Sequence, residues 1–344
     1  MRYRLFGRSG LRVSEFILGT MVFGDGPQWV GMPTSEPKAA REVFDVFAAA
    51  GGNMIDTASR YTEGRSEELV GEFVGSERER FVLSTKYTLS IDGSDPNASG
   101  NHRKSLMRSL EQSLRRLRTD YVDILWVHIW DADTPVDETL RALDDAVTAG
   151  KVLYVGISDA PSWVVARANT LAELRGWTPF VGLQVPYSLV QRDIERELLP
   201  VAQAFGMTVT VWSPLAGGLL SGKYVDGNGS SGRLDIGSIS EHDLAVARET
   251  LAVARELGVS STQVALAWVR GQSPLIHPII GPRKLEQLND CLGAVDVELP
   301  DEMLSRLAAV SGFEPGFPSE LLANAWTNTF VYGEAGELVD HRRI

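Results

Sequence analysis

The chain has 344 residues, of which 44% are hydrophobic and 23% charged, and its formal net charge at pH 7 is -12. This acidic balance argues against a nucleic-acid partner, which needs a basic surface, and against electrostatic binding to a membrane. The single cysteine, Cys291, excludes an intrachain disulfide and fits a reducing compartment. Because no signal-peptide core and no apolar run of about 18 residues is present, we expect a cytoplasmic protein without a membrane span.

The first 15 residues predict a β-hairpin, because two short apolar segments flank a turn from Gly7 to Gly10. Short apolar strands then alternate with segments of helical periodicity. In the first half, strands are predicted at 16–18, 54–56, 81–85 and 121–128, and helices at 36–50, 65–75, 103–117 and 136–149. In the second half, strands are predicted at 152–157, 180–185, 207–212 and 276–280, and helices at 162–174, 194–205, 241–257, 261–271, 284–292 and 301–310.

Eight strands alternating with helices predict an α/β fold with a parallel sheet, and the short apolar strands are typical of a sheet covered on both faces. An open doubly wound sheet would require a Gly-x-Gly-x-x-Gly turn after the first strand, which the segment from Gly19 to Gly26 does not match. We therefore expect a closed (β/α)8 TIM barrel whose base is closed by the hairpin. The whole chain, 1–344, is expected to form one domain, with extra C-terminal helices and an irregular surface tail over 311–344.

Polar side chains follow the second, third and fourth predicted strands. Groups at the carboxyl ends of barrel strands line the site, so these residues should share one small volume: Asp56, Tyr61, Lys86 and His128. Each alone has an ordinary explanation, as a turn cap, a surface aromatic, a solvated lysine or a satisfied core histidine. Together they favour a functional site, because a lysine and a histidine that end apolar strands are costly to leave unpaired.

This set of residue types predicts proton transfer to a carbonyl oxygen. A lysine cation about 4 Å from a phenol, at an effective dielectric of about 20, favours tyrosinate by about 4 kcal/mol, or about three pKa units. Lys86 would thereby bring Tyr61 into range for general acid–base work. Asp56 would keep Lys86 charged, and His128 would orient the substrate oxygen. Carbonyl reduction needs a proton at this position, and a cofactor must supply the hydride.

Several segments resemble the aldo-keto reductases in identity, order and spacing, from the hairpin to about residue 310. They are Met54-Ile-Asp56-Thr-Ala with Tyr61, Gly64, Ser66 and Glu67; Ser84-Thr-Lys86-Tyr87; Asp120-Tyr-Val-Asp123-Ile-Leu-Trp-Val-His128; Val155-Gly-Ile-Ser158; and the run from Trp212 to Tyr224. The resemblance implies a TIM barrel, a cofactor site without a Rossmann fold, and a catalytic tetrad in which Tyr61 is the general acid. It also implies reduction of an aldehyde or ketone by NADPH, with a keto-sugar among the candidate substrates.

The resemblance further implies the cofactor contacts. Ser158, Asp159 and Gln184 would hold the nicotinamide carboxamide, Trp212 would stack on its ring, and Arg283 suits a 2′-phosphate. The expected cofactor-binding residues are Gly19, Thr20, Met21, Asp56, Ser158, Asp159, Gln184, Trp212, Ser213, Pro214, Leu215, Gly217, Lys223, Gly281, Arg283 and Gln287.

Three positions depart from the residues usual in the family. Asp159 stands where asparagine is usual, and a carboxylate can accept from the carboxamide NH2 but cannot donate to its oxygen. Cys291 stands where an adenine-binding asparagine often occurs, and Trp212 replaces the commoner tyrosine. The first two departures leave NADH open as an alternative to NADPH.

The expected substrate is a small carbonyl compound bound between loop residues, namely Trp29, Tyr61, Tyr87, His128 and Trp130. The alternative function is a catalytically weak, cofactor-sensing regulatory subunit of the same fold, such as relatives that serve ion channels. A phosphate-binding P-loop over 217–223 is a weaker alternative, because Tyr224 occupies the place of the required Ser or Thr. The scattered histidines predict no metal site, and no feature predicts the oligomeric state.

Overall fold

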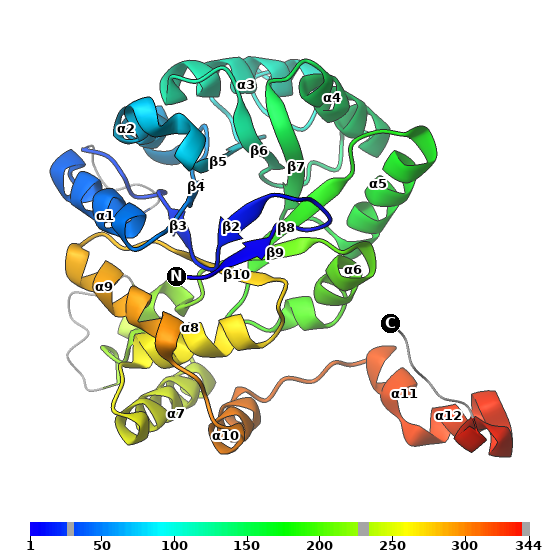
Figure 1. The fold of residues 1–344 in the computed structure, drawn as a ribbon. Coiled ribbons are helices and arrows are strands. Elements are labelled where there is room, and N and C mark those ends of the chain that lie inside the picture. Colours follow the sequence, from blue (N-terminus) through cyan, green and yellow to red (C-terminus); the bar gives the residue numbers. More distant parts are fainter. Residues whose placement is uncertain (26–30, 226–233, 339–344) are drawn as a thin grey trace.

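The computed structural model describes residues 1–25, 31–225 and 234–338. Eight parallel strands close into a barrel in the order β10-β3-β4-β5-β6-β7-β8-β9, as Figure 1 shows. The hairpin is β1 (Tyr3–Leu5) and β2 (Arg12–Ser14), and the barrel strands are β3 (Ile17–Gly19), β4 (Met54–Asp56), β5 (Val82–Tyr87), β6 (Val122–Val127), β7 (Val152–Ser158), β8 (Phe180–Pro186), β9 (Thr208–Trp212) and β10 (Ile276–Ile280). The predicted closed barrel with an N-terminal hairpin is confirmed.

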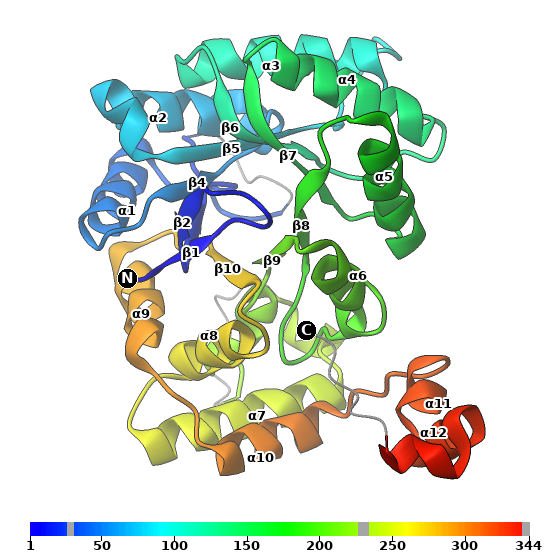
Figure 2. The ribbon, with the colours of Figure 1, turned by 45° about the vertical axis from the view of Figure 1, so that its right-hand side comes forward.

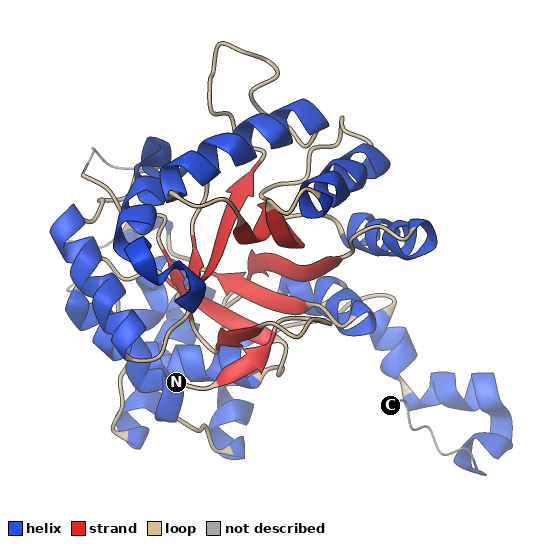
Figure 3. Ribbon diagram, turned by 45° about the horizontal axis from the view of Figure 1, so that its top comes forward, coloured by secondary structure: helices blue, strands red, loops and turns tan. Residues whose placement is uncertain are grey.

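Helices surround the barrel (Figure 3). Their apolar faces are buried against the strands, and several end at a left-handed glycine, such as Gly176, Gly206 and Gly258. The α-helices of the barrel are α1 (Pro37–Ala49), α2 (Arg65–Val74), α3 (Arg103–Leu117), α4 (Val136–Thr148), α5 (Ser162–Arg175), α6 (Leu198–Phe205), α7 (Glu241–Leu257), α8 (Ser261–Gly271), α9 (Leu285–Gly293) and α10 (Asp301–Ser311).

Side chains along each strand alternate between the barrel interior and the helix layer. On β5, Ser84 and Lys86 both reach Asp56 on the inside, whereas Thr85 donates to Glu67 of α2 on the outside at 2.6 Å. On the following strands, His128, Ser158 and Gln184 each come two residues after an inward position occupied by Trp126, Gly156 and Gly182, respectively. Strand parity therefore aims all of these polar groups at the barrel mouth.

The base of the barrel is filled by apolar side chains. Phe6 and Val13 of the hairpin pack against inward residues that include Trp126, whose ring meets Phe6 edge-on with centroids 6.2 Å apart. Gly156 and Gly182 make room for the indole, because a Cβ added at either would lie within 3.0 Å of it, at 2.3 and 2.8 Å. The hairpin therefore closes the end of the barrel opposite the polar mouth.

Two predicted segments differ from the structure. The helix predicted over 194–205 is a 3-10 turn, Asp193–Glu195, followed by α6 from Leu198. The reason is Pro200, which cannot donate to residue 196 and fits only within the first turn of a helix.

The irregular tail predicted for 311–344 is instead largely helical over its described part. It contains α11 (Ser319–Ala323), α12 (Ala325–Tyr332) and a 3-10 turn at Gly333–Leu338. Figures 1 and 2 show this C-terminal arm projecting from the barrel beyond α10. Its apolar side chains, such as Leu322 and Phe330, are exposed, which explains why its sequence shows no periodic core-facing stripe.

Candidate active site

A buried ion pair forms the floor of the barrel mouth. Nζ of Lys86 lies 2.5 Å from Oδ2 of Asp56 and donates to the backbone oxygen of Thr57 at 2.8 Å. Oδ1 of Asp56 accepts from Ser84 at 2.7 Å and from Gln184 at 3.2 Å. Burial opposes the charge on Lys86, but Asp56 and Tyr61 outweigh this effect and raise the pKa of Lys86. Lys86 is therefore a cation at neutral pH, although it is fully buried.

The remaining two members of the predicted tetrad stand directly beside this pair. Nζ of Lys86 lies 4.7 Å from the centroid of the Tyr61 ring. The rings of Tyr61 and His128 meet edge-on, with centroids 5.7 Å apart. The structure thus brings together Asp56 of β4, Lys86 of β5, Tyr61 of the loop after β4 and His128, which directly follows β6, as predicted from the strand ends.

The loop that carries Tyr61 is held in a strained conformation. Thr62 and Glu63 have left-handed φ angles of 46° and 58°, which cost non-glycine residues about 1–3 kcal/mol each. Arg116 of α3 donates to the backbone oxygen of Ser59 at 2.9 Å and to the fully buried Glu67 at 3.2 Å. This network fixes the start of the loop to α2 and α3, which restrains the position of Tyr61.

The electrostatics of the site correct one sequence-based expectation. Burial raises the pKa of Tyr61, and the charge and hydrogen bond of Lys86 only partly offset that effect. The expected net lowering of the Tyr61 pKa is wrong, because the loss of water around the phenol outweighs the effect of the neighbouring cation. Tyr61 is therefore a neutral phenol able to donate a proton. Burial and Lys86 lower the pKa of His128 well below 6.5, so its imidazole is neutral too.

A second group of predicted residues lies at the ends of β7, β8 and β9. Ser158 and Gln184 are paired in register and buried, next to Asp159 with its left-handed φ of 46°. The indole Nε1 of Trp212 donates to Oδ1 of Asp159 at 3.2 Å, and Trp212 is 37% exposed. An exposed aromatic face next to buried polar groups is suited to a flat heteroaromatic ring such as nicotinamide.

The loop after β9 has the backbone of an anion cradle. Ser213, Gly217 and Gly218 all have positive φ, and the backbone nitrogen of Gly217 is within 3.3 Å of the Ser213 hydroxyl. A Cβ at Gly218 would lie 3.0 Å from Nζ of Lys223, so the glycine allows this cation to approach the loop. The left-handed backbone of these successive glycines and the nearby lysine fit a pyrophosphate.

The expected adenosine end lies around β10 and α9. Gly281 follows β10, and the backbone nitrogen of Arg283 donates to the side chain of Gln287 at 2.8 Å. Within the described residues the guanidinium of Arg283 has no ion-pair partner, which suits an external phosphate. Cys291 is buried, and its desolvation raises the pKa of its thiol to about 12, so this residue presents no polar group to an adenine.

Directly after β3, the backbone nitrogen and hydroxyl of Thr20 both donate to the backbone oxygen of Asp56, at 3.0 and 3.1 Å. Thr20 is buried and Met21 half-buried, beside Gly19 at the end of β3. Thr20 therefore braces β4, and Met21 is the more accessible of the two. Pro214 and Leu215 continue the loop after β9 before the 3-10 turn Ala216–Ser221.

The expected substrate wall is only partly formed as anticipated. Tyr87 does not face the mouth, because it is one residue past the inward Lys86 on β5 and therefore points into the helix layer. It is fully buried in the main core, and its hydroxyl donates to the backbone oxygen of Asn101 at 3.2 Å. Trp130 is half-buried on the loop after β6, whereas Trp29 lies outside the described residues.

Some supporting residues escaped sequence analysis. Ser84 bonds Asp56 directly, and its parity with Lys86 on β5 was the available signal. Asn101 exchanges hydrogen bonds with Asp131, donating from its backbone nitrogen at 3.0 Å and accepting from that of Asp131 at 3.1 Å. It also donates to the backbone oxygen of Ile129 at 3.0 Å, so it anchors the loop that carries Trp130. This contact joins two polar loops, and nothing in the local sequence marked it.

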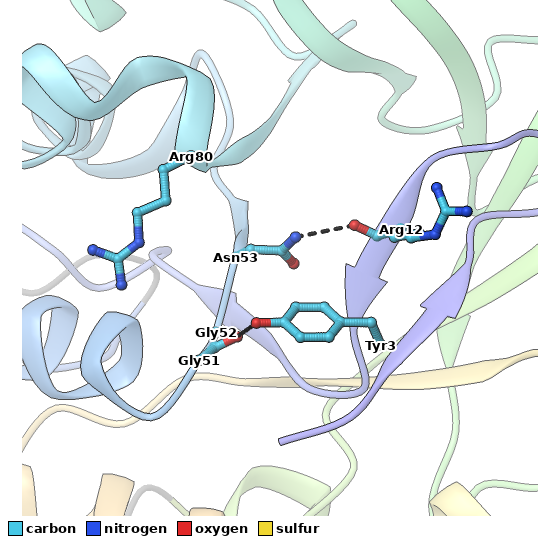
Figure 4. A pocket seen from close by; sticks show the side chains of 6 residues that line it. All are labelled: Tyr3, Arg12, Gly51, Gly52, Asn53 and Arg80. Atoms are coloured by element: carbon cyan, nitrogen blue, oxygen red, sulfur yellow. Dashed lines mark hydrogen bonds between the residues drawn. The ribbon is translucent and has the colours of Figure 1, made fainter.

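A separate hollow of about 340 Å³ lies at the base of the barrel (Figure 4). Asn53, which precedes β4, donates to the backbone oxygen of Arg12, and Tyr3 donates to that of Gly51 at 2.7 Å. These groups bind the hairpin to the barrel and lie at the opposite end from Asp56. Among residues 1–25, 31–225 and 234–338, no group of three or more metal-ligating side chains is found and no helix is long and apolar enough to cross a membrane.

Comparison with known proteins gives a consistent result. The model of the Aldo/keto reductase family matches residues 15–311. A norsolorinic acid reductase of Emericella nidulans is 40% identical, covering 91% of this chain and 82% of its own length. An aryl-alcohol dehydrogenase [NADP(+)] of Phanerodontia chrysosporium is 36% identical over 95% of this chain and 90% of its own. A putative aryl-alcohol dehydrogenase of Saccharomyces cerevisiae is also 36% identical, over 94% and 90%.

Proposed function

Since the chain belongs to the aldo/keto reductase family and is thus an NAD(P)H-dependent oxidoreductase, we propose that it reduces an aldehyde or ketone with NADPH, using Tyr61 as the proton donor. The observation that carries this proposal is the buried pair of Lys86 and Asp56, 2.5 Å apart, with the Lys86 cation 4.7 Å from the ring centroid of a neutral tyrosine. A neutral phenol next to a fixed cation can release its proton as negative charge develops on a neighbouring oxygen.

Each member of the tetrad has a distinct role in the proposed reaction. Tyr61 donates its hydroxyl proton to the carbonyl oxygen, and the cation of Lys86 stabilises the phenolate that this leaves. Asp56 holds Lys86 charged and in position. Neutral His128 donates a hydrogen bond to the same oxygen and thereby orients the carbonyl. Solvent returns a proton to the phenolate, so Tyr61 is ready for another turnover.

NADPH, when bound, would supply the hydride that the carbonyl carbon accepts. The residues suited to hold it are Trp212 beside the nicotinamide, the loop of Gly217 and Lys223 at the pyrophosphate, and Arg283 at the 2′-phosphate. The preference for NADPH over NADH is supported by the guanidinium of Arg283, and by one relative named as NADP(+)-dependent.

For the substrate we favour an aryl aldehyde or ketone over a keto-sugar. Three of the relatives are named as aryl-alcohol dehydrogenases, one of them as a putative one. The accessible side chains near the mouth include Trp130, the 43% exposed Ile129 and Trp212, which offer apolar and aromatic area more readily than the polar groups a sugar requires.

Tyr61→Phe tests the proposal against a regulatory, cofactor-sensing role. The substitution removes only the hydroxyl, so NADPH should still bind while the rate of benzaldehyde reduction, followed by loss of NADPH absorbance, falls by at least about a thousandfold. A parent protein that binds NADPH but reduces none of a panel of aryl, alkyl and sugar carbonyls would favour the sensing role. Unchanged turnover in Tyr61→Phe would refute the role of Tyr61.

A further inference from the structure

Asp159 is a charged residue at the site that the proposed chemistry does not use. Its left-handed φ of 46° turns the side chain at the end of β7 toward the end of β9, where Trp212 donates to its Oδ1. Its backbone is fixed on both sides, because its nitrogen donates to Gln184 at 3.2 Å and its oxygen accepts from Trp130 at 3.4 Å. The carboxylate is therefore held rigidly beside the exposed indole of Trp212 at the end of β9.

The position of Asp159 makes its charge felt in the active site. The cation of Lys86 stabilises the ionised form of Asp159, and Asp159 in turn contributes to raising the pKa of Tyr61. Burial raises the pKa of Asp159, while the hydrogen bond from Trp212 acts in the opposite direction. The carboxylate thus interacts electrostatically with Lys86 and Tyr61, although it makes no contact with the Lys86–Asp56 pair.

The charges of the described mouth do not cancel. Lys86 and Asp56 neutralise each other as an ion pair, and His128 and Tyr61 are both neutral. Gln184 on β8 carries no charge, and Asp131 after β6 is turned toward Asn101 and Thr134. Apart from Lys223, whose Nζ lies beside Gly218 in the loop after β9, an ionised Asp159 therefore leaves one net negative charge where the nicotinamide would lie.

This residual charge distinguishes the two redox forms of the cofactor. The oxidised nicotinamide ring carries a positive charge that the reduced ring lacks, whereas the phosphates are the same in both. We propose that the Asp159 carboxylate makes this site bind the oxidised cofactor more tightly than the reduced one, and so couples the redox state of the bound cofactor to a proton. This inference rests on the proposed function, since it requires a nicotinamide beside Trp212.

The pH dependence follows from the sign of the interaction. A cationic ring favours ionised Asp159, so binding of the oxidised form lowers the pKa of Asp159 and releases a proton when the pH is near that pKa. The preference for the oxidised form is complete above the pKa of Asp159 in the free protein and is lost as the pH falls through it. Binding of the reduced form should release no proton from this group.

The test compares dissociation constants of NADP+ and NADPH for the full chain, by titration calorimetry and tryptophan fluorescence, between about pH 4.5 and pH 8. Asp159→Asn is the matched variant, because asparagine also tolerates a left-handed backbone and keeps an acceptor for Trp212. At pH 8 it should raise the ratio of the NADP+ to the NADPH dissociation constant by about tenfold, equivalent to about 1.4 kcal/mol. Calorimetry in two buffers of different ionisation enthalpy should show proton release on NADP+ binding in the parent only.

Two further variants provide a charge control and a second perturbation of Asp159. Asp133→Asn removes a negative charge from an exposed loop at the same end of the barrel and should leave the ratio unchanged. Trp212→Phe removes the hydrogen bond that favours ionised Asp159, so the pH at which the preference is lost should rise; this shift tests the inference even if Asp159→Asn does not fold.

The outcomes separate this inference from the proposed function. A ratio in folded Asp159→Asn within about twofold of the parent, or an equal change in Asp133→Asn, overturns the role of Asp159 while leaving the reductase proposal standing. A parent protein that binds neither cofactor form overturns both.

Discussion

Replacing Lys86 with methionine removes the cation next to Tyr61 while keeping most of the side-chain volume. The ammonium lies 4.7 Å from the phenol ring centroid. At an effective dielectric of about 20, this separation corresponds to about 3.5 kcal/mol of stabilisation for a phenolate. If half to all of that energy is expressed in the transition state, kcat falls between about 20-fold and 400-fold.

The assay is steady-state reduction of an aryl aldehyde, with NADPH binding measured in parallel. Lys86→Met leaves Asp56 as a buried, unpaired charge, which should cost about 3–5 kcal/mol of stability. The double variant Asp56→Asn/Lys86→Met removes both charges, so it should recover much of that stability while kcat stays low. A folded Lys86→Met protein with kcat within about fivefold of the parent would show that the cation does not act on the phenol.

Two further predictions concern residues outside the tetrad. Tyr87→Phe should cost about 1 kcal/mol of unfolding free energy, through loss of the hydrogen bond to Asn101, and leave KM unchanged. Trp130→Ala should raise KM about two- to tenfold. A larger rise in KM from Tyr87→Phe than from Trp130→Ala would contradict the outward orientation of Tyr87. Burial lowers the pKa of His277 to about 4, so the unfolded chain takes up a proton that the folded one refuses, and stability falls as pH drops below about 6.5. Urea unfolding at about pH 7 and pH 4.5 should show a loss about 2.5 kcal/mol larger for the parent than for His277→Gln, and equal losses would refute this.

The fold and the tetrad could be predicted because their signals are local. Short apolar runs that alternate with amphipathic segments predict the barrel, and the last residue of each run lies at the carboxyl end of a strand. Asp56, Lys86 and His128 each end such a run, so their convergence followed from the topology alone. The signal for the break before α6 is also local, since Pro200 excludes a continuous helix, but the apolar periodicity of the segment obscured it.

Other features depend on contacts between segments far apart in the chain. The outward direction of Tyr87 follows from strand parity only when the inward face of β5 is known, which the contacts of Ser84 and Lys86 decide. The high pKa of Tyr61 reflects a balance between burial and a cation, and burial is a property of the assembled barrel rather than of any motif.

The link between Asp159 and Trp212 shows the same division. The sequence by itself determined that Trp212 ends a strand of the barrel and that Asp159 directly follows one. Only the tertiary structure decided that the ends of β7 and β9, 53 positions apart in sequence, bring an indole N–H within 3.2 Å of a carboxylate. The physical reason is that residue type and periodicity determine where strands begin and end, whereas the distance and solvent exposure between two strand ends are set by the packing of the whole barrel.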